Sequence, residues 1–172
     1  MIIIVEGIDR VGKTTLCNKL EKSIRGFKVY KRAESDFDFS KMDNMNETDK
    51  IIQMLEIYSM NPGYIIFDRL HFTDFVYGML ERNYDYAEAK INLEKIEDKL
   101  LELDTNLILV QPTDIKESSK QHGKDLKDYA RAFDVLYNHS KLRKIMCNYN
   151  SIDIVVELMK ERFNESVNQH LH

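Results

Sequence analysis

The first fifteen residues constrain the fold more than any other stretch of this 172-residue chain. Ile2–Val5 is a continuous apolar, β-branched run, which is typical of a strand buried on both faces. The pattern Gly7-x-x-x-x-Gly12-Lys13-Thr14 follows without a gap and matches a phosphate-binding loop. Apolar residues then recur at helical spacing, at Leu16, Leu20 and Ile24. The motif therefore has the strand before it and the helix after it that its function requires.

The residue types in this loop indicate its chemistry. Glycine at positions 7 and 12 allows backbone conformations and close approaches that a Cβ would block. Loop amides and a helix N-terminus direct partial positive charge at nucleotide phosphates. We expect Lys13 to reach the β- and γ-phosphates and the Thr14 hydroxyl to coordinate Mg²⁺. The predicted cofactors are thus ATP and Mg²⁺. The predicted nucleotide-binding residues are Gly7, Ile8, Asp9, Arg10, Val11, Gly12, Lys13, Thr14 and Thr15.

Composition limits the partners and the compartment. A net charge of -4 provides no overall basic field for nucleic acid, so phosphate binding must be local and no nucleic-acid partner is expected. Cys17 and Cys147 offer neither a disulfide framework nor a metal-binding spacing, and Cys17 is expected to be an inert core thiol. The N-terminal apolar run is too short for a signal peptide or a membrane span. We therefore expect a cytoplasmic protein with no membrane partner.

Further strands and helices alternate along the chain. Strands are predicted at 27–30, 64–68, 106–110 and 151–156, and helices from 48, at 71–80, 87–103 and 126–146, and from 157. The polar segment 33–46 is predicted to be irregular or a short helix. This alternation favours an α/β fold in which a five-stranded parallel sheet carries helices on both faces. The length fits one domain over residues 1–172.

A second site is predicted where the strand 64–68 ends. In an open parallel sheet, ligands bind beyond the carboxyl ends of the strands, so Asp68 and Arg69 are expected beside the phosphate loop. Asp68 is a candidate for the Mg²⁺ site, and the Arg69 guanidinium is suited to clamp a second phosphate. The alternative is an Asp–Arg pair that merely closes a strand.

Several residues keep two interpretations. Phe72 and Tyr77 either belong to a core stripe or face a bound base or sugar, whereas His71 is expected to be structural rather than a catalytic base. The segment 113–127 is rich in lysine and poor in apolar residues, which favours a mobile lid over a surface turn. Its lysines are Lys116, Lys120, Lys124 and Lys127. Arg131 and Arg143 face either solvent or nucleotide.

Two motifs carry a resemblance to a known family. Glu6–Thr15 resembles the phosphate loop of thymidylate kinases, and Phe67-Asp68-Arg69 resembles their Asp-Arg motif. The resemblance implies the three-layer P-loop kinase fold and a homodimer. It also implies that Asp9 lies near the acceptor sugar and that Arg10 assists phosphoryl transfer, as in members with an arginine in the loop and none in the lid. Arg69 would bind the acceptor phosphate, with Asp68 at the Mg²⁺ site.

The chain departs from that family where the acceptor is recognised. Tyr30-Lys-Arg-Ala-Glu34 replaces the usual Thr-Arg-Glu-Pro, which leaves Arg32 as a loose match for a substrate-binding arginine. Leu70 and Tyr77-Gly78 stand where the family has Tyr and Tyr-Gln, and the missing glutamine belongs to thymine recognition. The chain is also short between its second and third strands. A divergent, phage-type deoxynucleotide kinase fits these departures.

Three functions remain open. The first is transfer of the γ-phosphoryl group of ATP to a nucleoside monophosphate, with dTMP giving dTDP as the leading case. The second is a deoxynucleoside kinase or another small-molecule kinase. That interpretation is disfavoured because Asp68-Arg69-Leu70 replaces the Glu-Arg-Ser of nucleoside kinases, and because a base for a free hydroxyl has only Glu6 or Asp36 as weak candidates. The third is a nucleotide-binding regulatory module, but Asn18-Lys-Leu-Glu21 does not match a guanine-specifying Asn-Lys-x-Asp motif.

Overall fold

The computed structural model describes residues 1–31, 47–60, 63–123 and 125–169. The predictions for Arg32, for the segment 33–46 with Asp36, and for Lys124 lie outside these residues. The strands are β1 (Ile2–Glu6), β2 (Phe27–Lys31), β3 (Tyr64–Asp68), β4 (Thr105–Gln111) and β5 (Arg143–Asn148). The helices are α1 (Lys13–Ser23), α2 (Glu47–Met60), α3 (His71–Glu81), α4 (Tyr86–Leu101), α5 (Ile115–His122), α6 (Lys127–His139), the short η3 (Tyr149–Ser151) and α7 (Ile152–Gln169).

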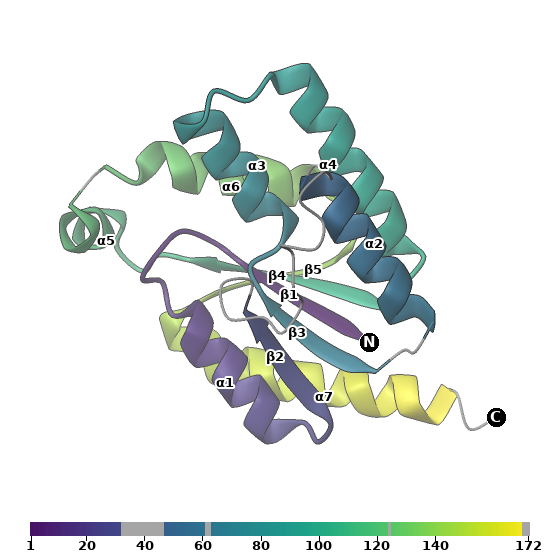
Figure 1. Cartoon of the computed structure of the whole chain (residues 1–172). Coiled ribbons are helices and arrows are strands. Elements are labelled where there is room, and N and C mark those ends of the chain that lie inside the picture. Colours follow the sequence, from purple (N-terminus) through teal and green to yellow (C-terminus); the bar gives the residue numbers. More distant parts are fainter. Residues whose placement is uncertain (32–46, 61–62, 124, 170–172) are drawn as a thin grey trace.

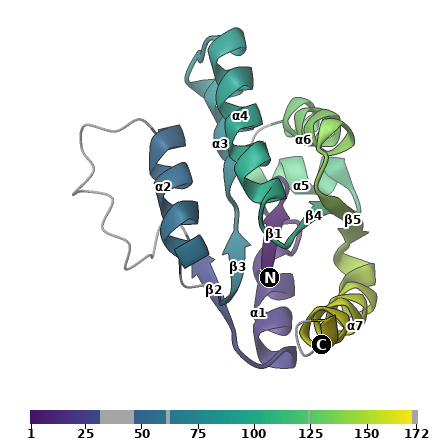
Figure 2. The same ribbon diagram turned by 90° about the vertical axis from the view of Figure 1, so that its right-hand side faces the viewer.

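The described strands form one parallel sheet in the order β2-β3-β1-β4-β5. Helices α1 and α7 cover one face of the sheet, and α2, α3, α4 and α6 lie on the other (Figures 1 and 2). The predicted fold class, a three-layer α/β fold with a parallel sheet between helices, is therefore confirmed. Strand β1 is central, so the loop after it opens between the ends of β3 and β4.

Burial explains why the central strands could be predicted from the sequence. Every residue of β1 is buried, and Leu107–Val110 of β4 is buried as well, so these strands are apolar without alternation. Strands and helices at the sheet centre therefore match the predicted ranges within one or two residues. The exception lies at the β5 edge of the sheet.

The predicted last strand, 151–156, is wrong. Ile152, Val155, Val156 and Met159 are all buried, and their spacing of three and four places them on one face of α7. Asn148 and Ser151 form a capping box that starts this helical segment. The β-branched residues suggest a strand because periods of 2 and 3.6 are hard to separate over six residues.

The real fifth strand occupies the end of the helix predicted at 126–146. Strand β5 pairs with β4 through Asn106↔Arg143 to Gln111↔Asn148 and mixes exposed and buried residues, as an edge strand does. Helix α6 ends at His139, followed by Ser140 as C-cap. The charged residues of β5 conceal its strand character in the sequence.

Both cysteines are buried. Burial raises the pKa of the Cys17 thiol, and it raises the pKa of the Cys147 thiol to about 11. The expectation that Cys17 is an inert core thiol is consistent with this environment. In the described part of the chain, no helix is both long enough and apolar enough to span a bilayer.

Candidate active site

A cavity of about 920 Å³ opens beyond the carboxyl ends of β1, β2 and β3. Its described lining consists of Asp9, Arg10, Gly12, Lys13, Thr14, Thr15, Lys31, Asp68, Arg69 and Tyr149. Four of these side chains are cationic and two are carboxylates, so the cavity is locally positive in a chain of net charge -4. The cavity therefore lies at the carboxyl ends of the strands, where the sequence predicted a ligand site.

Two glycines shape the loop between β1 and α1. Gly7 has φ 136°, and a Cβ there would lie 2.3 Å from the Val110 carbonyl oxygen of β4. Gly12 has φ 98° and is the N-cap residue of α1, with Tyr149 close to the position of its missing Cβ. Neither position tolerates a larger residue without strain. The loop therefore delivers the N-terminus of α1 into the cavity, where its amides favour an anion.

Arg10 and Arg69 also adopt the left-handed region, with φ values of 62° and 76°. Such conformations are costly for residues with a Cβ and persist where the surroundings determine them. Both arginines line the cavity. Two of the three described non-glycine residues with positive φ are therefore the arginines that the sequence predicted for phosphate binding; the third is Asn83, after α3.

Lys13 is the buried cation of the site. Its ammonium group donates a hydrogen bond to the Ile8 carbonyl oxygen within the loop. Burial lowers the pKa of Lys13 to about 8, and the charges of Asp68 and Glu6 oppose part of that shift. A phosphate in the cavity would replace the carbonyl as a partner and favour the charged form.

Thr14 and Asp68 meet across the cavity. The Thr14 hydroxyl donates to Asp68 Oδ2 at 3.0 Å, although 54 residues separate them in sequence. Hydroxyl and carboxylate oxygens are the ligands that Mg²⁺ accepts, and it normally keeps waters and substrate phosphates as well. Among the described residues, no group of three or more His, Cys, Asp or Glu side chains is placed to hold a metal alone. This donor pair therefore fits a Mg²⁺ ion that arrives with a nucleotide.

Asp9, Arg69 and Tyr77 form a second cluster. The Arg69 guanidinium donates to Asp9 Oδ1, and the Tyr77 hydroxyl donates to Asp9 Oδ2 at 3.3 Å. The guanidinium carbon lies 5.9 Å from the centre of the Tyr77 ring. Residues from the phosphate loop, the end of β3 and helix α3 are thus joined at one side of the cavity.

Solved structures of known proteins share this arrangement of strands and helices. A Bacillus subtilis YorR structure in complex with phosphorylated GDP matches with a TM-score of 0.68 and 21% identity, over 100% of this chain and 99% of that one. A thymidylate kinase from Ehrlichia chaffeensis matches with a TM-score of 0.57 and 15% identity, over 95% and 98% of the two chains. A deoxyadenosine kinase from M. mycoides with bound dATP matches with a TM-score of 0.53 and 15% identity, over 95% of this chain and 100% of that one.

This chain has the P-loop kinase fold. At these identities the likeness concerns the fold alone, and the sequence by itself matches no family model and no curated protein. Within that fold, the structure brings together most residues that were predicted for the site. The predicted set that meets around the cavity is Asp9, Arg10, Gly12, Lys13, Thr14, Thr15, Asp68, Arg69 and Tyr77.

Phe72 does not join this cavity and is a correction. Its side chain is fully buried, and its ring centre lies 4.6 Å from that of His71 in the core. His71 is buried too and pairs with Glu97 at 3.5 Å, which agrees with its structural interpretation. The side chains of Ile8 and Val11 are buried, so only their backbone is available to a nucleotide.

Two cavity residues were not proposed from the sequence. Lys31 ends β2 directly opposite Asp68 of β3, and Tyr149 begins η3 after β5. Lys31 was detectable in principle, because it is a basic residue at the carboxyl end of a predicted strand. Tyr149 was not detectable, because the strand before it was misassigned.

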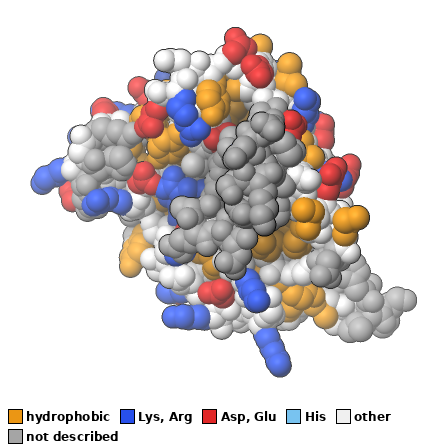
Figure 3. Space-filling model, in the orientation of Figure 1, with side chains coloured by type: hydrophobic (Ala, Val, Ile, Leu, Met, Phe, Trp, Pro, Cys, Tyr) orange, Lys and Arg blue, Asp and Glu red, His pale blue; other side chains and the backbone are white. Residues whose placement is uncertain are grey.

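The predicted lid segment contains a short helix, α5, whose first residue, Ile115, lines a second cavity together with Gly7 and Ile8 of the phosphate loop. In α5, the Asp114 side chain caps the N-terminus by accepting from the amides of Lys116 and Glu117, and Gly123 ends the helix with φ 79°. Basic side chains project from this end of the molecule (Figure 3). Whether the helix moves stays a prediction.

Arg131 and Arg143, whose surroundings the sequence left open, lie in different parts of the structure. Arg131 lines a second cavity of about 360 Å³ that also includes Gly7 and Ile8 of the phosphate loop. Arg143 begins β5 at the opposite edge of the sheet and pairs with Asp104 at 3.3 Å. Arg131 is therefore near the phosphate loop, and Arg143 is not.

Proposed function

We propose that this protein transfers the γ-phosphoryl group of ATP, with Mg²⁺, to a deoxynucleoside monophosphate. The Asp9–Arg69 pair beside the phosphate loop carries this proposal. A guanidinium forms paired hydrogen bonds with phosphate oxygens, so a second cation site next to the nucleotide loop suits an acceptor that already carries a phosphate. The dTMP-to-dTDP reaction is the leading case, from the resemblance of both motifs to thymidylate kinases.

The catalytic work assigned to this chain is positioning and charge neutralisation. The loop from Gly7 to Thr15 holds the donor phosphates, while Lys13 and Arg10 stabilise the charge that spreads over the transferred group. Arg69 holds the acceptor phosphate, and Asp9 and Tyr77 orient Arg69 from both sides. A bound Mg²⁺, held by Thr14 and Asp68, would supply further neutralisation of phosphate charge.

A deoxynucleoside kinase is the second candidate. It is supported by the fold likeness to the M. mycoides deoxyadenosine kinase and by the partly exposed Asp9 carboxylate at the acceptor side. This carboxylate would have to accept the proton of a free hydroxyl. The other base considered from sequence, Glu6, is fully buried and is unsuited to that task.

The acceptor base is tested by a direct panel. We would measure ADP release with Mg·ATP against dTMP, dUMP, dCMP, dGMP and thymidine. Guanine belongs in the panel because the YorR structure of similar fold was solved with phosphorylated GDP. Turnover with one monophosphate and none with thymidine supports the proposal and identifies the substrate.

Other outcomes choose among the alternatives. Turnover with thymidine alone would favour the nucleoside kinase and remove the acceptor-phosphate role from Arg69. ATP binding without turnover on any acceptor, together with nucleotide-dependent binding of a protein, would favour the regulatory module.

A further inference from the structure

Glu6 is the last residue of β1 and directly precedes the phosphate loop. Its side chain is fully buried, which is unfavourable for a carboxylate unless hydrogen-bond donors surround it. Glu6 lies outside the Gly7–Thr14 pattern and outside the acceptor cluster, and its described influence on the phosphate loop is its charge, which raises the pKa of Lys13. Its burial therefore requires another explanation.

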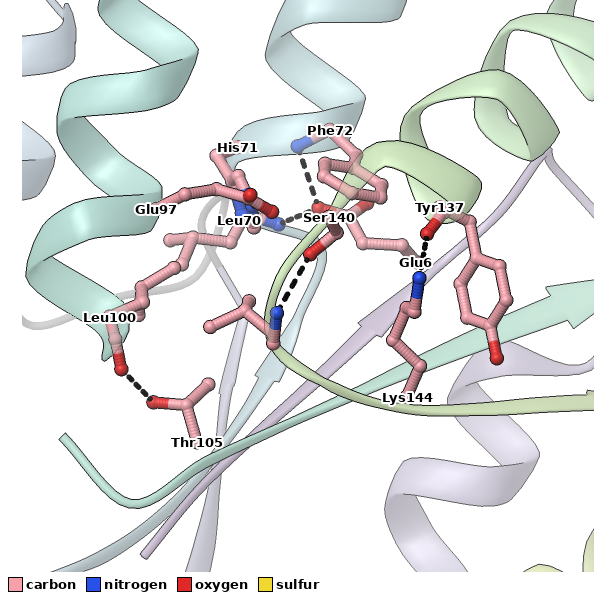
Figure 4. Close-up of polar contacts among 11 residues, drawn as sticks. Glu6, Leu70, His71, Phe72, Glu97, Leu100, Thr105, Tyr137, Ser140 and Lys144 are labelled. Atoms are coloured by element: carbon pink, nitrogen blue, oxygen red, sulfur yellow. Dashed lines mark hydrogen bonds and ion pairs between the residues drawn. The ribbon is translucent and has the colours of Figure 1, made fainter. Parts of the chain in front are cut away.

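Three donors from the start of α3 meet the Glu6 carboxylate. The amides of Leu70 and Phe72 both donate to Oε1, at 2.9 and 3.0 Å, and the Thr73 hydroxyl donates to Oε2 at 2.5 Å. Figure 4 shows the carboxylate beside the two amides. Leu70, the N-cap residue of α3, makes no side-chain cap of its own. Glu6 therefore caps this helix from another strand and places its negative charge at the helix N-terminus.

The capped segment begins immediately after Arg69. The Arg69 amide donates to the Val5 carbonyl oxygen at 3.0 Å, and the next amide, of Leu70, donates to Glu6. Two consecutive residues at the end of β1 therefore hold the backbone before and after Arg69. Arg69 has φ 76°, a conformation that needs such external restraint. The restraint from Val5 alone is one hydrogen bond of an ordinary parallel pair, whereas Glu6 adds three.

We propose that Glu6 is a positioning residue that fixes Arg69 relative to the phosphate loop. A single buried carboxylate then sets the separation of the donor and acceptor phosphates, because the loop leaves β1 at Gly7 and the acceptor arginine precedes the helix that Glu6 caps. This inference rests on the proposed function where it names the acceptor phosphate. The claim about the geometry of Arg69 does not depend on the substrate.

The kinetic test compares Glu6→Ala with Glu6→Gln. At pH 7, below the pKa of Lys13, removing all three contacts is expected to reduce kcat/KM for the monophosphate acceptor about 10- to 100-fold, since small misplacements of a clamp are costly. The Kd of Mg·ATP should change only slightly, and equally in both variants, because both remove the Glu6 charge that raises the pKa of Lys13. Glutamine keeps an Oε1 acceptor for both amides and presents an NH₂ group to the Thr73 oxygen. It should therefore restore most of the acceptor kcat/KM. Equal losses for ATP and acceptor in Glu6→Ala would overturn the proposal.

The matched control is Asp85→Ala. Asp85 caps α4 by accepting from the Glu88 amide at 2.9 Å, so it is also a carboxylate helix cap, but it does not border the cavity. Its loss should lower the melting temperature and leave the acceptor KM unchanged. A rise in acceptor KM in this variant would mean that general helix loosening explains the effect at Glu6.

A double-mutant cycle with Arg69→Ala separates positioning from stability. Residues that act through one another are not additive, so Glu6→Ala should cause little further loss of acceptor kcat/KM once Arg69 is absent. Full additivity contradicts the inference. If Glu6→Ala does not fold, Thr73→Val removes one donor at constant volume and should give a smaller effect of the same kind.

A crystal structure of the variant tests the geometry without any acceptor. In Glu6→Ala, or in Thr73→Val if the first does not fold, Arg69 should leave positive φ or lose its pair with Asp9. An unchanged Arg69 would overturn the inference even for an active enzyme. If the wild-type protein phosphorylates nothing in the panel but Arg69 moves as expected, the proposed function fails and the positioning role stands.

Discussion

The sides of the cavity that we propose for the phosphate donor and for the acceptor are built in different ways. The donor side is one continuous segment, in which Gly7–Thr15 contributes both the loop and the start of α1. The acceptor side is assembled from Asp9 in that loop, Arg69 after β3 and Tyr77 in the middle of α3. A continuous segment preserves its function in a recognisable pattern, whereas a dispersed cluster depends on the fold to bring its members together.

The charges on the two sides are also controlled differently. Lys13 is buried, and that burial lowers its pKa to about 8. Arg69 is partly exposed and is held by a carboxylate and an aromatic ring instead. The donor side is thus tuned by removal of water, and the acceptor side by direct partners.

The largest expected effect is on the donor side. Lys13→Ala should fold normally yet reduce kcat by about 10²-fold or more, because it removes a charge that stabilises the transition state. Lys19→Ala on the same helix is the control, since Lys19 pairs with Asp153 at 2.6 Å on an exposed surface. Steady-state ADP release measures both variants. Near-normal turnover in Lys13→Ala would remove the catalytic role from the loop.

Arg69→Ala should affect the acceptor side selectively. The KM of the monophosphate should rise about 10- to 100-fold, because a hydrogen bond to a charged group contributes about 1.5–3 kcal/mol. The Kd of Mg·ATP should stay within about threefold, since the donor segment is intact. Arg82→Ala is the matched control, because Arg82 has a similar carboxylate partner, Asp74, and a similar tyrosine, Tyr84. If Arg69→Ala weakened the binding of Mg·ATP as much as that of the acceptor, Arg69 would not be specific to the acceptor side.

The lowered pKa of Lys13 predicts a pH dependence of nucleotide binding. Phosphates favour the ammonium form, so below about pH 8 Lys13 is already charged in the free protein, and above it binding must take up a proton. The affinity for Mg·ATP should therefore fall by about tenfold per pH unit between pH 8.5 and 9.5. Isothermal titration calorimetry in buffers of different ionisation enthalpy measures both affinity and proton uptake. Lys13→Arg stays charged over this range, so the dependence of Mg·ATP affinity on pH should disappear in this variant. If the variant keeps the pH dependence of the wild type, the titrating group is not Lys13.

The smallest effect is expected from Tyr77→Phe. It removes the hydroxyl that donates to Asp9 but keeps the ring beside Arg69, so the acceptor KM should rise about threefold. Tyr137→Phe is the control: the Lys144 ammonium lies over the Tyr137 ring, away from the main cavity, so this variant should leave that KM unchanged. A change in Mg·ATP affinity alone would place Tyr77 on the donor side instead.

The fold was predictable wherever one period dominated a segment. Strands β1 and β4 are uniformly apolar, and the phosphate-loop pattern requires a helix directly after β1, so these elements were placed correctly. The chain after His139 was not, because β5 carries Arg143 and Lys144 at an exposed edge while the β-branched start of α7 resembles a strand. The conformations of β5 and of the start of α7 depend on packing against the rest of the fold, and a window of about six residues does not contain that information.

The site divides in the same manner. Lys13, Thr14, Asp68 and Arg69 were placed together because the carboxyl ends of parallel strands share one edge of a sheet. The cap made by Glu6 on α3 was not predictable, because nothing local in the sequence pairs a strand residue with amides more than sixty positions later. Phe72 was assigned equally to core and ligand, since an aromatic in a helical stripe serves either purpose until its surroundings are known.

The two buried cysteines make this protein convenient for measuring motion. Thiols with raised pKa values are largely protonated at neutral pH, and alkylating reagents attack the thiolate. A cysteine introduced at Lys120 of α5 would therefore be labelled selectively while the native thiols remain in place. A fluorophore at that position would report, as nucleotide is added, whether the surroundings of α5 change.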